Sequence, residues 1–206
     1  MTENTYHQDR LNRVVDHLAE KYVGVFAKET IERVVFESYA SLLRSGAKPN
    51  FVTNFAEKFS RDRLVALATV KSAVAKEKPE VLFVCVQNSG RSQMAMAFMS
   101  QLSGGKVNVR SAGSMPAGEV SSKTIEVMNE LGFDLTEAFP KPLTDDVVQA
   151  ADVVITMGCG DACPLYPGKK YLDWELEDPA HLDIDGVRRV RDEIKTRVET
   201  LLAELL

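Results

Sequence analysis

Long apolar runs are missing from this 206-residue sequence. The longest lie at residues 81–86 and 153–157, whereas a membrane-spanning helix needs about 20 apolar residues. The start of the chain also lacks the apolar segment behind a basic one that marks a secretory signal. These absences exclude a membrane span from the expected features, and we expect the chain to work in the cytosol.

An excess of basic residues is missing too, since the formal charge is −5 at pH 7. Proteins that hold nucleic acid use a surplus of Lys and Arg to pair with phosphates, so we expect no nucleic-acid partner. The charge is uneven along the chain. Residues 1–78 hold 13 Lys and Arg against 10 Asp and Glu, whereas residues 79–206 hold 12 against 20. This difference is a first indication of two domains.

Cysteine is scarce as well, with only Cys85, Cys159 and Cys163 in the sequence. A small and odd number of cysteines in a chain of this length does not describe a disulfide-stapled fold. We therefore expect reduced thiols, which either carry chemistry or are simply buried in the core.

Strand-like alternation is absent before residue 81, and the first 78 residues show helical patterns instead. Apolar side chains recur every three or four residues over 11–22, from about 28 to a glycine cap at Ser45-Gly46, and over 51–74. Pro49-Asn50 is expected as a turn, and the pattern allows a break near Ser60. The predicted buried faces contain Leu11, Val14, Val15, Leu18 and Tyr22, then Ile31, Val34, Val35, Ser38, Leu42 and Leu43, then Phe55, Phe59, Leu64, Leu67 and Val70. The pattern predicts a small all-α three-helix bundle over 1–78, and the charged residues before Pro79 indicate a domain boundary there.

Strands and helices alternate over residues 79–206. Strands are predicted at 81–84, 107–110, 153–157 and 171–174, and helices at 91–101, 123–131 and 186–206. This alternation predicts an α/β three-layer domain, in which helices cover both faces of a four-stranded parallel sheet. Functional side chains are then expected at the carboxyl ends of the strands.

The segment Cys85-Val86-Gln87-Asn88-Ser89-Gly90-Arg91-Ser92 joins the first strand to the following helix. A tight loop in this place can turn successive backbone N–H groups inward, and the helix N-terminus adds a positive dipole, which suits a tetrahedral oxyanion. Arg91 can close the cradle with a forked pair of hydrogen bonds, and Ser92 can donate to a Cys85 thiolate. Cys85 is therefore the candidate nucleophile, although a small buried cysteine beside a solvated arginine is the simpler alternative. The candidate substrate-binding residues are Val86, Gln87, Asn88, Ser89, Gly90 and Arg91.

The segment from Cys85 to Ala95 resembles the signature of thioredoxin-linked arsenate reductases, which share their fold with low-molecular-weight protein tyrosine phosphatases. The other matching positions are Ser111-Ala112-Gly113, the pair Cys159 and Cys163, and Asp178-Pro179. The likeness covers residues 80–206, and the helical extension before it is similar to that of actinobacterial members. The resemblance implies the phosphatase-type sheet of four parallel strands and an enzyme of arsenic detoxification.

The resemblance also implies roles for an acid and for the two further cysteines. Asp178 would protonate the oxygen that leaves arsenate as Cys85 attacks, with Glu177 as the fallback. Cys159 would then attack Cys85 and release arsenite, and Cys163 would attack Cys159. Thioredoxin, as the external reductant, would reduce the resulting disulfide. No bound cofactor is implied, and phosphate is expected to compete with arsenate because the two anions have nearly the same shape and charge.

Two positions depart from the pattern of that family. Only three residues separate Cys159 from Cys163, fewer than in many members, although the glycines and Pro164 around them allow the bend of a disulfide. Met96 stands where potassium-binding members carry glutamate, and a thioether does not suit a hard cation. Zinc would require four ligands, and no histidine is close to the cysteines in sequence, so no metal is expected.

Three functions stay open on the sequence alone, with arsenate reduction as the leading hypothesis. A phosphatase for phosphotyrosine or a small phosphate ester would use the same loop and leave Cys159 and Cys163 dispensable. A binding module that senses oxyanions without turnover is the third. The helical domain holds no candidate nucleophile or metal cluster, and we expect its apolar residues to pair two copies of the chain in a homodimer.

Overall fold

The computed structural model describes residues 3–71, 76–158 and 163–206. The chain divides into two compact units, residues 1–75 and 76–206, so the predicted boundary lies three residues beyond this division. The predicted end of the third helix, residues 72–74, and Cys159 lie outside the described residues. In the part of the chain that is described, no helix combines the length and the apolar character that a membrane crossing requires.

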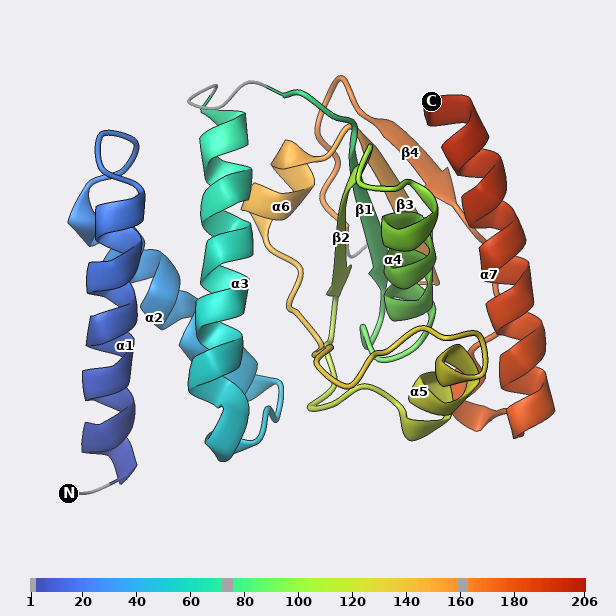
Figure 1. Cartoon of the computed structure of the whole chain (residues 1–206), viewed down its shortest axis with the longest axis horizontal. Coiled ribbons are helices and arrows are strands. Elements are labelled where there is room, and N and C mark those ends of the chain that lie inside the picture. The colour runs from blue at the N-terminus through green and yellow to red at the C-terminus, as the bar shows by residue number, and fades with distance from the viewer. Residues whose placement is uncertain (1–2, 72–75, 159–162) are drawn as a thin grey trace. The chain divides into compact units, whose positions relative to one another are not determined.

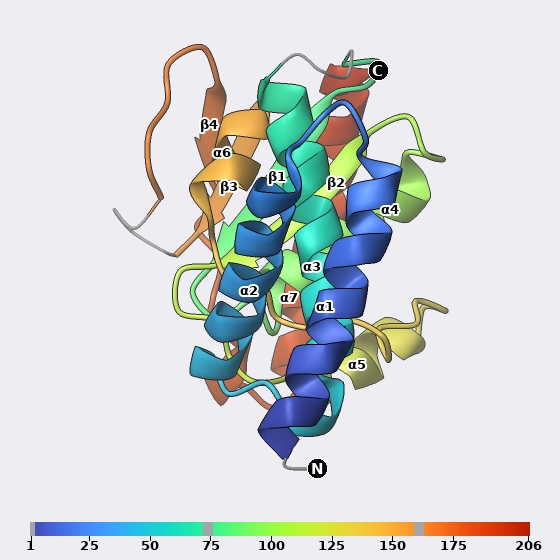
Figure 2. The same cartoon turned by 90° about the vertical axis from the view of Figure 1, so that its left-hand side faces the viewer.

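The described part of the first unit consists of three helices, α1 (Glu3–Lys21), α2 (Lys28–Arg44) and α3 (Pro49–Val70), as Figure 2 shows. They pack through most of the predicted faces, since Leu11, Val14, Val15, Leu18, Tyr22, Ile31, Val34, Val35, Leu42, Phe59 and Leu64 are buried. A buried arginine links two of the helices. Arg63 of α3 donates to Ser38 Oγ at 3.1 Å and pairs with Glu37 Oε2 at 3.1 Å, both on α2. The predicted three-helix bundle is confirmed.

Some details of the helical prediction are wrong. α3 continues through Ser60, whose hydroxyl donates to the Ala56 carbonyl at 2.6 Å without interrupting the helix. Pro49 lies in the first turn of α3 and not in a turn before it, because a missing N–H is tolerated at that position. Leu43 and Val70 were expected on the buried faces, but both are exposed.

The second unit is built on a parallel sheet in the order β2-β1-β3-β4. Its strands are β1 (Glu80–Cys85), β2 (Asn108–Gly113), β3 (Val153–Met157) and β4 (Lys170–Asp173). In Figure 1, α4 (Arg91–Leu102) and α7 (Ile184–Leu205) cover one face of the sheet, and α6 (Asp145–Ala150) lies on the other. The short helix α5 (Ser122–Asn129) packs against α7. The predicted α/β three-layer domain with four parallel strands is confirmed.

The predicted elements of this unit differ from the observed ones mainly at their ends. β2 extends three residues further than predicted, because residues 111–113 continue to pair in register with 83–85. β4 begins one residue earlier, and α6 was not predicted, since six residues are too few to show a helical period. α7 starts two residues earlier than predicted, because Asp183 caps it by accepting a hydrogen bond from Gly186 N at 2.8 Å.

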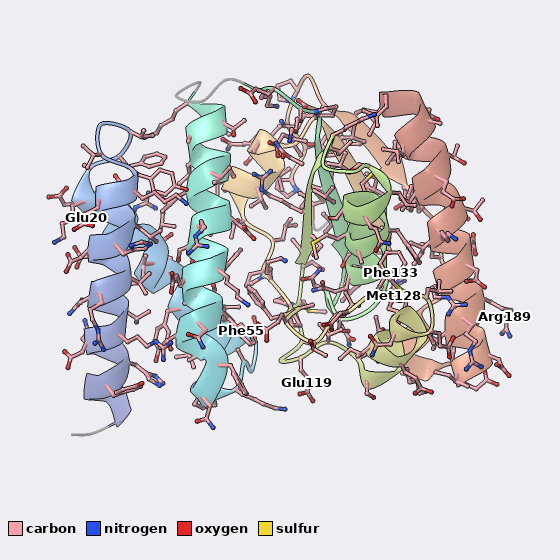
Figure 3. The ribbon with its side chains drawn as sticks, viewed as in Figure 1. Glu20, Phe55, Glu119, Met128, Phe133 and Arg189 are labelled. Carbon is pink, nitrogen blue, oxygen red and sulfur yellow. The ribbon has the colours of Figure 1, made fainter. Side chains whose placement is uncertain are left out.

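The core of the second unit lies between the sheet and the two helices α4 and α7. Phe83 of β1 and Phe98 of α4 are fully buried there. The rings of Phe98 and Phe133 meet edge to face with their centroids 4.9 Å apart. Both Met128 and Phe133, labelled in Figure 3, contribute to this core. Close packing beneath β1 and α4 fixes the two elements that carry the loop between them.

Candidate active site

The loop 85–92 turns its backbone N–H groups inward because its carbonyl groups are bonded outward. Four carbonyl oxygens accept hydrogen bonds of 2.9–3.1 Å from the segment that follows β2: Cys85 from Ser114, Val86 from Met115, Gln87 from Ala117 and Ser89 from Ser121. In a trans peptide the N–H points opposite to the preceding carbonyl, so the N–H groups that follow these carbonyls face the inside of the loop. α4 begins directly after the loop and adds its N-terminal dipole. The loop can therefore hold an oxyanion.

The sulfur of Cys85 lies at the carboxyl end of β1, between two polar contacts. Ser92 Oγ is 2.9 Å from Cys85 Sγ, and Asn88 N donates to Sγ at 3.2 Å. Asn88 Nδ2 donates to Ser92 Oγ at 2.7 Å. With that bond accepted by the Ser92 oxygen, the Ser92 hydroxyl hydrogen is free to be donated to the sulfur when Cys85 is deprotonated. Asn88 N therefore presents a donor to the sulfur, and Ser92 Oγ can present a second one.

Asn88 adopts an unfavourable backbone conformation in this loop. Its φ of 48° is the only positive value at a non-glycine residue in the described part of the chain, and a left-handed residue costs about 1–2 kcal/mol. The side chain offsets this cost, because Oδ1 accepts from Lys141 N at 2.8 Å while Nδ2 reaches Ser92. Asn88 thus braces the loop through its side chain.

Arg91 and Asp178 are paired in this structure. Arg91 is buried, with 7% of its surface exposed, and its Nη2 lies 3.1 Å from Asp178 Oδ2. Its Nη1 donates to the Leu176 carbonyl at 3.3 Å. Asp178 Oδ1 accepts from Ala180 N at 3.0 Å, which starts the short helix η2 (Pro179–His181). The guanidinium and the carboxylate are held together at the loop, so an arriving anion would compete with Asp178 for Arg91.

A cavity of about 250 Å³ opens at the loop and brings several of the predicted residues together. Its described lining consists of Cys85, Gln87, Ser89, Gly90, Arg91, Ala117, Glu119, Ser121, Thr124, Asp178, Pro179 and Ala180. None of these side chains is aromatic. Figure 3 labels Glu119, an exposed carboxylate. Glu177, the fallback acid, is exposed and is not among the described lining residues.

Cys163 lies in the connection between β3 and β4. It is buried, with 7% of its surface exposed, and it lines a second cavity of about 570 Å³ with Thr156, Pro164, Leu165, Tyr171, Leu172 and Asp173. The hydroxyl of Tyr171 accepts from Tyr166 N at 2.9 Å and donates to the Pro164 carbonyl at 3.3 Å, which ties down the turn after Cys163. Because Met157, the last residue of β3, pairs with Cys85 in the sheet, the connection from β3 to β4 starts beside Cys85.

Met96 packs against a lysine. Lys141 Nζ lies 4.0 Å from Met96 Sδ. Among the described residues, no three His, Cys, Asp or Glu side chains gather in a group that could hold a metal ion.

Three residues that support the loop were not singled out from the sequence. Gly113 leaves no room for a side chain, since an added Cβ would lie 2.7 Å from Val86 O and 2.9 Å from Asn88 N. Gln93 and Lys141 bond to Asn88. Gly113 and Gln93 lie inside the motifs that carry the family resemblance, but those motifs do not indicate what the two residues contact. Lys141 carries no local signal, because its partner is 53 residues away in sequence.

Comparison with protein families places both units. Residues 80–206 match the model of the low molecular weight phosphotyrosine protein phosphatase family, and residues 11–68 match the protein-tyrosine-phosphatase-like N-terminal domain. Arsenate reductase 1 of Staphylococcus epidermidis is 39% identical over 128 residues, which span 60% of this chain and 96% of that protein. The glutaredoxin arsenate reductase of Synechocystis is 37% identical over 129 residues, or 61% of this chain and 98% of that protein.

A solved structure matches nearly the whole chain. The thioredoxin-dependent arsenate reductase of Corynebacterium glutamicum is 48% identical, with a TM-score of 0.87 over 97% of each chain. The resemblance to thioredoxin-linked arsenate reductases with a helical N-terminal domain is thereby confirmed. On the match over residues 80–206, the chain belongs to the low molecular weight phosphotyrosine protein phosphatase family.

Proposed function

We propose that this chain reduces arsenate to arsenite, with Cys85 as nucleophile and Cys159 and Cys163 as its internal reductant. The observation that carries the proposal is the pairing of an oxyanion loop at the end of β1 with a buried thiol, Cys163, in the connection after the adjacent strand β3. Relatives named as arsenate reductases cover 96% and 98% of their own length in the match, and one solved relative covers 97% of both chains.

The first step is the capture of arsenate and its attack by sulfur. The inward N–H groups of the loop and the Arg91 guanidinium bind its oxygens, and Arg91 exchanges its Asp178 contact for the anion. The Cys85 thiolate then forms a bond to arsenic. Asp178 supplies the proton that lets one oxygen leave as water. The product is a covalent adduct between Cys85 and As(V).

The second step is the transfer of two electrons. The Cys159 thiolate attacks Cys85 Sγ, so that a disulfide bond forms, the sulfur–arsenic bond breaks and its electron pair goes to arsenic. Arsenic leaves as arsenite, As(III). Cys163 then attacks Cys159 and frees the Cys85 thiolate. The Cys159–Cys163 disulfide is reduced by an external dithiol, so the relay needs only these side chains and that reductant.

The lining of the first cavity favours a free oxyanion over a phosphotyrosine. A phosphorylated aromatic ring needs apolar or aromatic walls around it. The described walls hold no aromatic side chain, and beside Ala117, Pro179 and Ala180 they carry the polar side chains of Gln87, Ser89, Glu119, Ser121 and Thr124. The phosphatase hypothesis leaves Cys163 without a use, and a sensing module would leave Asp178 without one.

Thioredoxin is the reductant that we propose, because an internal disulfide is a suitable substrate for thiol exchange. The relative from Corynebacterium glutamicum is thioredoxin-dependent, whereas the one from Synechocystis is named for glutaredoxin.

We further propose that the enzyme works in the cytosol, where arsenate competes with phosphate for the loop. A homodimer formed through the helical unit is part of the same proposal and predicts a solution mass of twice 22.8 kDa.

The proposal is tested by following NADPH consumption with arsenate, thioredoxin and thioredoxin reductase. Wild-type protein should turn over, and Cys85→Ser should be inactive with and without thioredoxin. Cys163→Ser should release about one arsenite per chain and then stop, because the attacks by Cys85 and Cys159 do not involve Cys163. A parallel reaction with glutaredoxin and glutathione separates the two reductants. Hydrolysis of an aryl phosphate that needs Cys85 but survives Cys163→Ser, without arsenate turnover, would support the phosphatase. Phosphate binding without any turnover would support the sensing module.

A further inference from the structure

Gln93 is a fully buried side chain beside the loop, and the steps above give it no role. It is the third residue of α4. Its amide nitrogen Nε2 lies near three oxygens, at 3.0 Å from Asn88 O, 3.1 Å from Asn88 Oδ1 and 3.0 Å from Phe139 O. An amide group has only two hydrogens. At least two of the three oxygens must therefore share one hydrogen.

These bonds tie the loop to two other parts of the unit. Gln93 belongs to the first turn of α4. Phe139 lies just before residues 141–143, which exchange backbone hydrogen bonds with Gly113 at the end of β2. The loop residue between them, Asn88, has a φ of 48°. A left-handed residue of this kind persists only where its surroundings hold it. Gln93 donates to both the backbone oxygen and the side-chain oxygen of Asn88.

We propose that Gln93 is the positioning residue of the oxyanion loop, an inference that rests on the function proposed above and acts through Asn88. With its two oxygens fixed, Asn88 directs its N–H to Cys85 Sγ and its Nδ2 to Ser92 Oγ. Gln93 is absent from the described lining of the cavity. Gln93 therefore contributes by orienting the groups that contact the sulfur and the anion.

Two substitutions separate this role from simple core packing. Gln93→Met keeps the length of the side chain but removes the donor, which leaves Asn88 O and Phe139 O without it. Gln93→Glu keeps the shape but presents only acceptors when ionised, and it regains one donor when the carboxyl is protonated. Met94→Leu is the matched control, because Met94 is the next residue of α4, is also fully buried, and changes little in volume.

The measurements are phosphate affinity and the rate of the first arsenite release. Phosphate affinity is read from protection of Cys85 against iodoacetamide, with Cys159→Ser and Cys163→Ser present so that one thiol remains. Gln93→Met should weaken phosphate binding and slow arsenite release, each by about tenfold or more, because misplaced groups lose orientation. Gln93→Glu should lose as much at pH 8 and recover part of it at pH 6, because its buried carboxyl takes up a proton. Met94→Leu should stay within about twofold of wild type.

Gln93→Met that binds phosphate and releases arsenite like the control would overturn the proposal. If Gln93→Met does not fold, Gln93→Glu decides, and a loss of equal size at pH 6 and pH 8 would count against the role. The phosphate measurement does not depend on arsenate reduction. A wild-type protein that binds phosphate but reduces no arsenate would therefore refute the proposed function and leave the inference on Gln93 open to its own test.

Discussion

Replacing Gly113 by alanine should disable the active site without touching a catalytic side chain. Gly113 is the last residue of β2 and pairs in register with Cys85. A Cβ at this position would lie 2.7 Å from Val86 O, 2.9 Å from Asn88 N and 3.0 Å from Asn88 Cβ. Ordinary contact begins at 3.4 Å, so the nearest atom must move by about 0.7 Å. All three atoms belong to the oxyanion loop or its brace.

The expected effect follows from that displacement. Overpacking of a tight site costs about 1–3 kcal/mol of stability. A misplacement of about 1 Å among reacting groups costs on the order of 100-fold in rate, which corresponds to about 2.7 kcal/mol in the barrier. Gly113→Ala should therefore lower the first-turnover rate of arsenite release by roughly 10- to 100-fold. The rate is measured by rapid quench on reduced enzyme, and stability by urea unfolding.

Gly132→Ala is the control for this substitution. Gly132 has a φ of 79° and no atom within 4 Å of an added Cβ, so alanine there meets backbone strain but no neighbour. It should lower stability by about 1 kcal/mol and leave the rate unchanged. A Gly113→Ala enzyme that reacts within about threefold of wild type would show that the loop absorbs the displacement, and the steric reasoning would then be wrong.

Three further perturbations test other parts of the structure. Asp178→Asn should slow the first turnover by about 100-fold or more, because the acid is lost. It should also tighten phosphate binding, because the carboxylate no longer competes for Arg91. A variant that turns over more slowly and also binds phosphate more weakly would contradict this pairing. Tyr171→Phe should leave the rate of the first arsenite release unchanged but lower the steady-state rate by roughly fivefold, because the Tyr171 hydroxyl holds the turn after Cys163. A slower first release would show that Tyr171 acts in an earlier step. The hydrogen bond from Arg188 lowers the pKa of Glu130 from 4.5 to about 2. Glu130→Gln should therefore reduce the free energy of unfolding at pH 7, and its difference from wild type should fade as the pH drops from 4.5 toward 2. Urea unfolding measures this difference, and a difference that stays constant over that pH range would refute the lowered pKa of Glu130.

The parts of the fold that could be predicted are those with a strong local pattern. The apolar run of β1 and the helical spacing of α2 and α7 are local, and so is the sequence from Cys85 to Ser92 between a strand and a helix. α6 was missed because six residues show no period. Ser60 was interpreted as a break because hydroxyl side chains compete with the backbone, but here its hydroxyl bonds within the helix.

The supports of the active site could not be predicted, because they join residues far apart in sequence. The bond from Lys141 N to Asn88 spans 53 residues, and the bond from Gln93 to Phe139 spans 46. Neither pair shows a spacing that local periodicity can detect. Cys85 was recognisable as a candidate nucleophile because an oxyanion loop between a strand and a helix uses adjacent residues. Its brace was not, because the brace is made by tertiary packing.

The strand order also separates support from chemistry. β1, which carries Cys85, lies between β2 and β3. From the β2 side come Gly113 and the segment 114–121, whose N–H groups hold the loop carbonyls in place. From the β3 and β4 side come Cys163 and Asp178, for which we propose the roles of recycling thiol and acid. Substitutions on the β2 side should therefore change anion binding and the first turnover together, whereas those around Cys163 should change only the recycling of the enzyme.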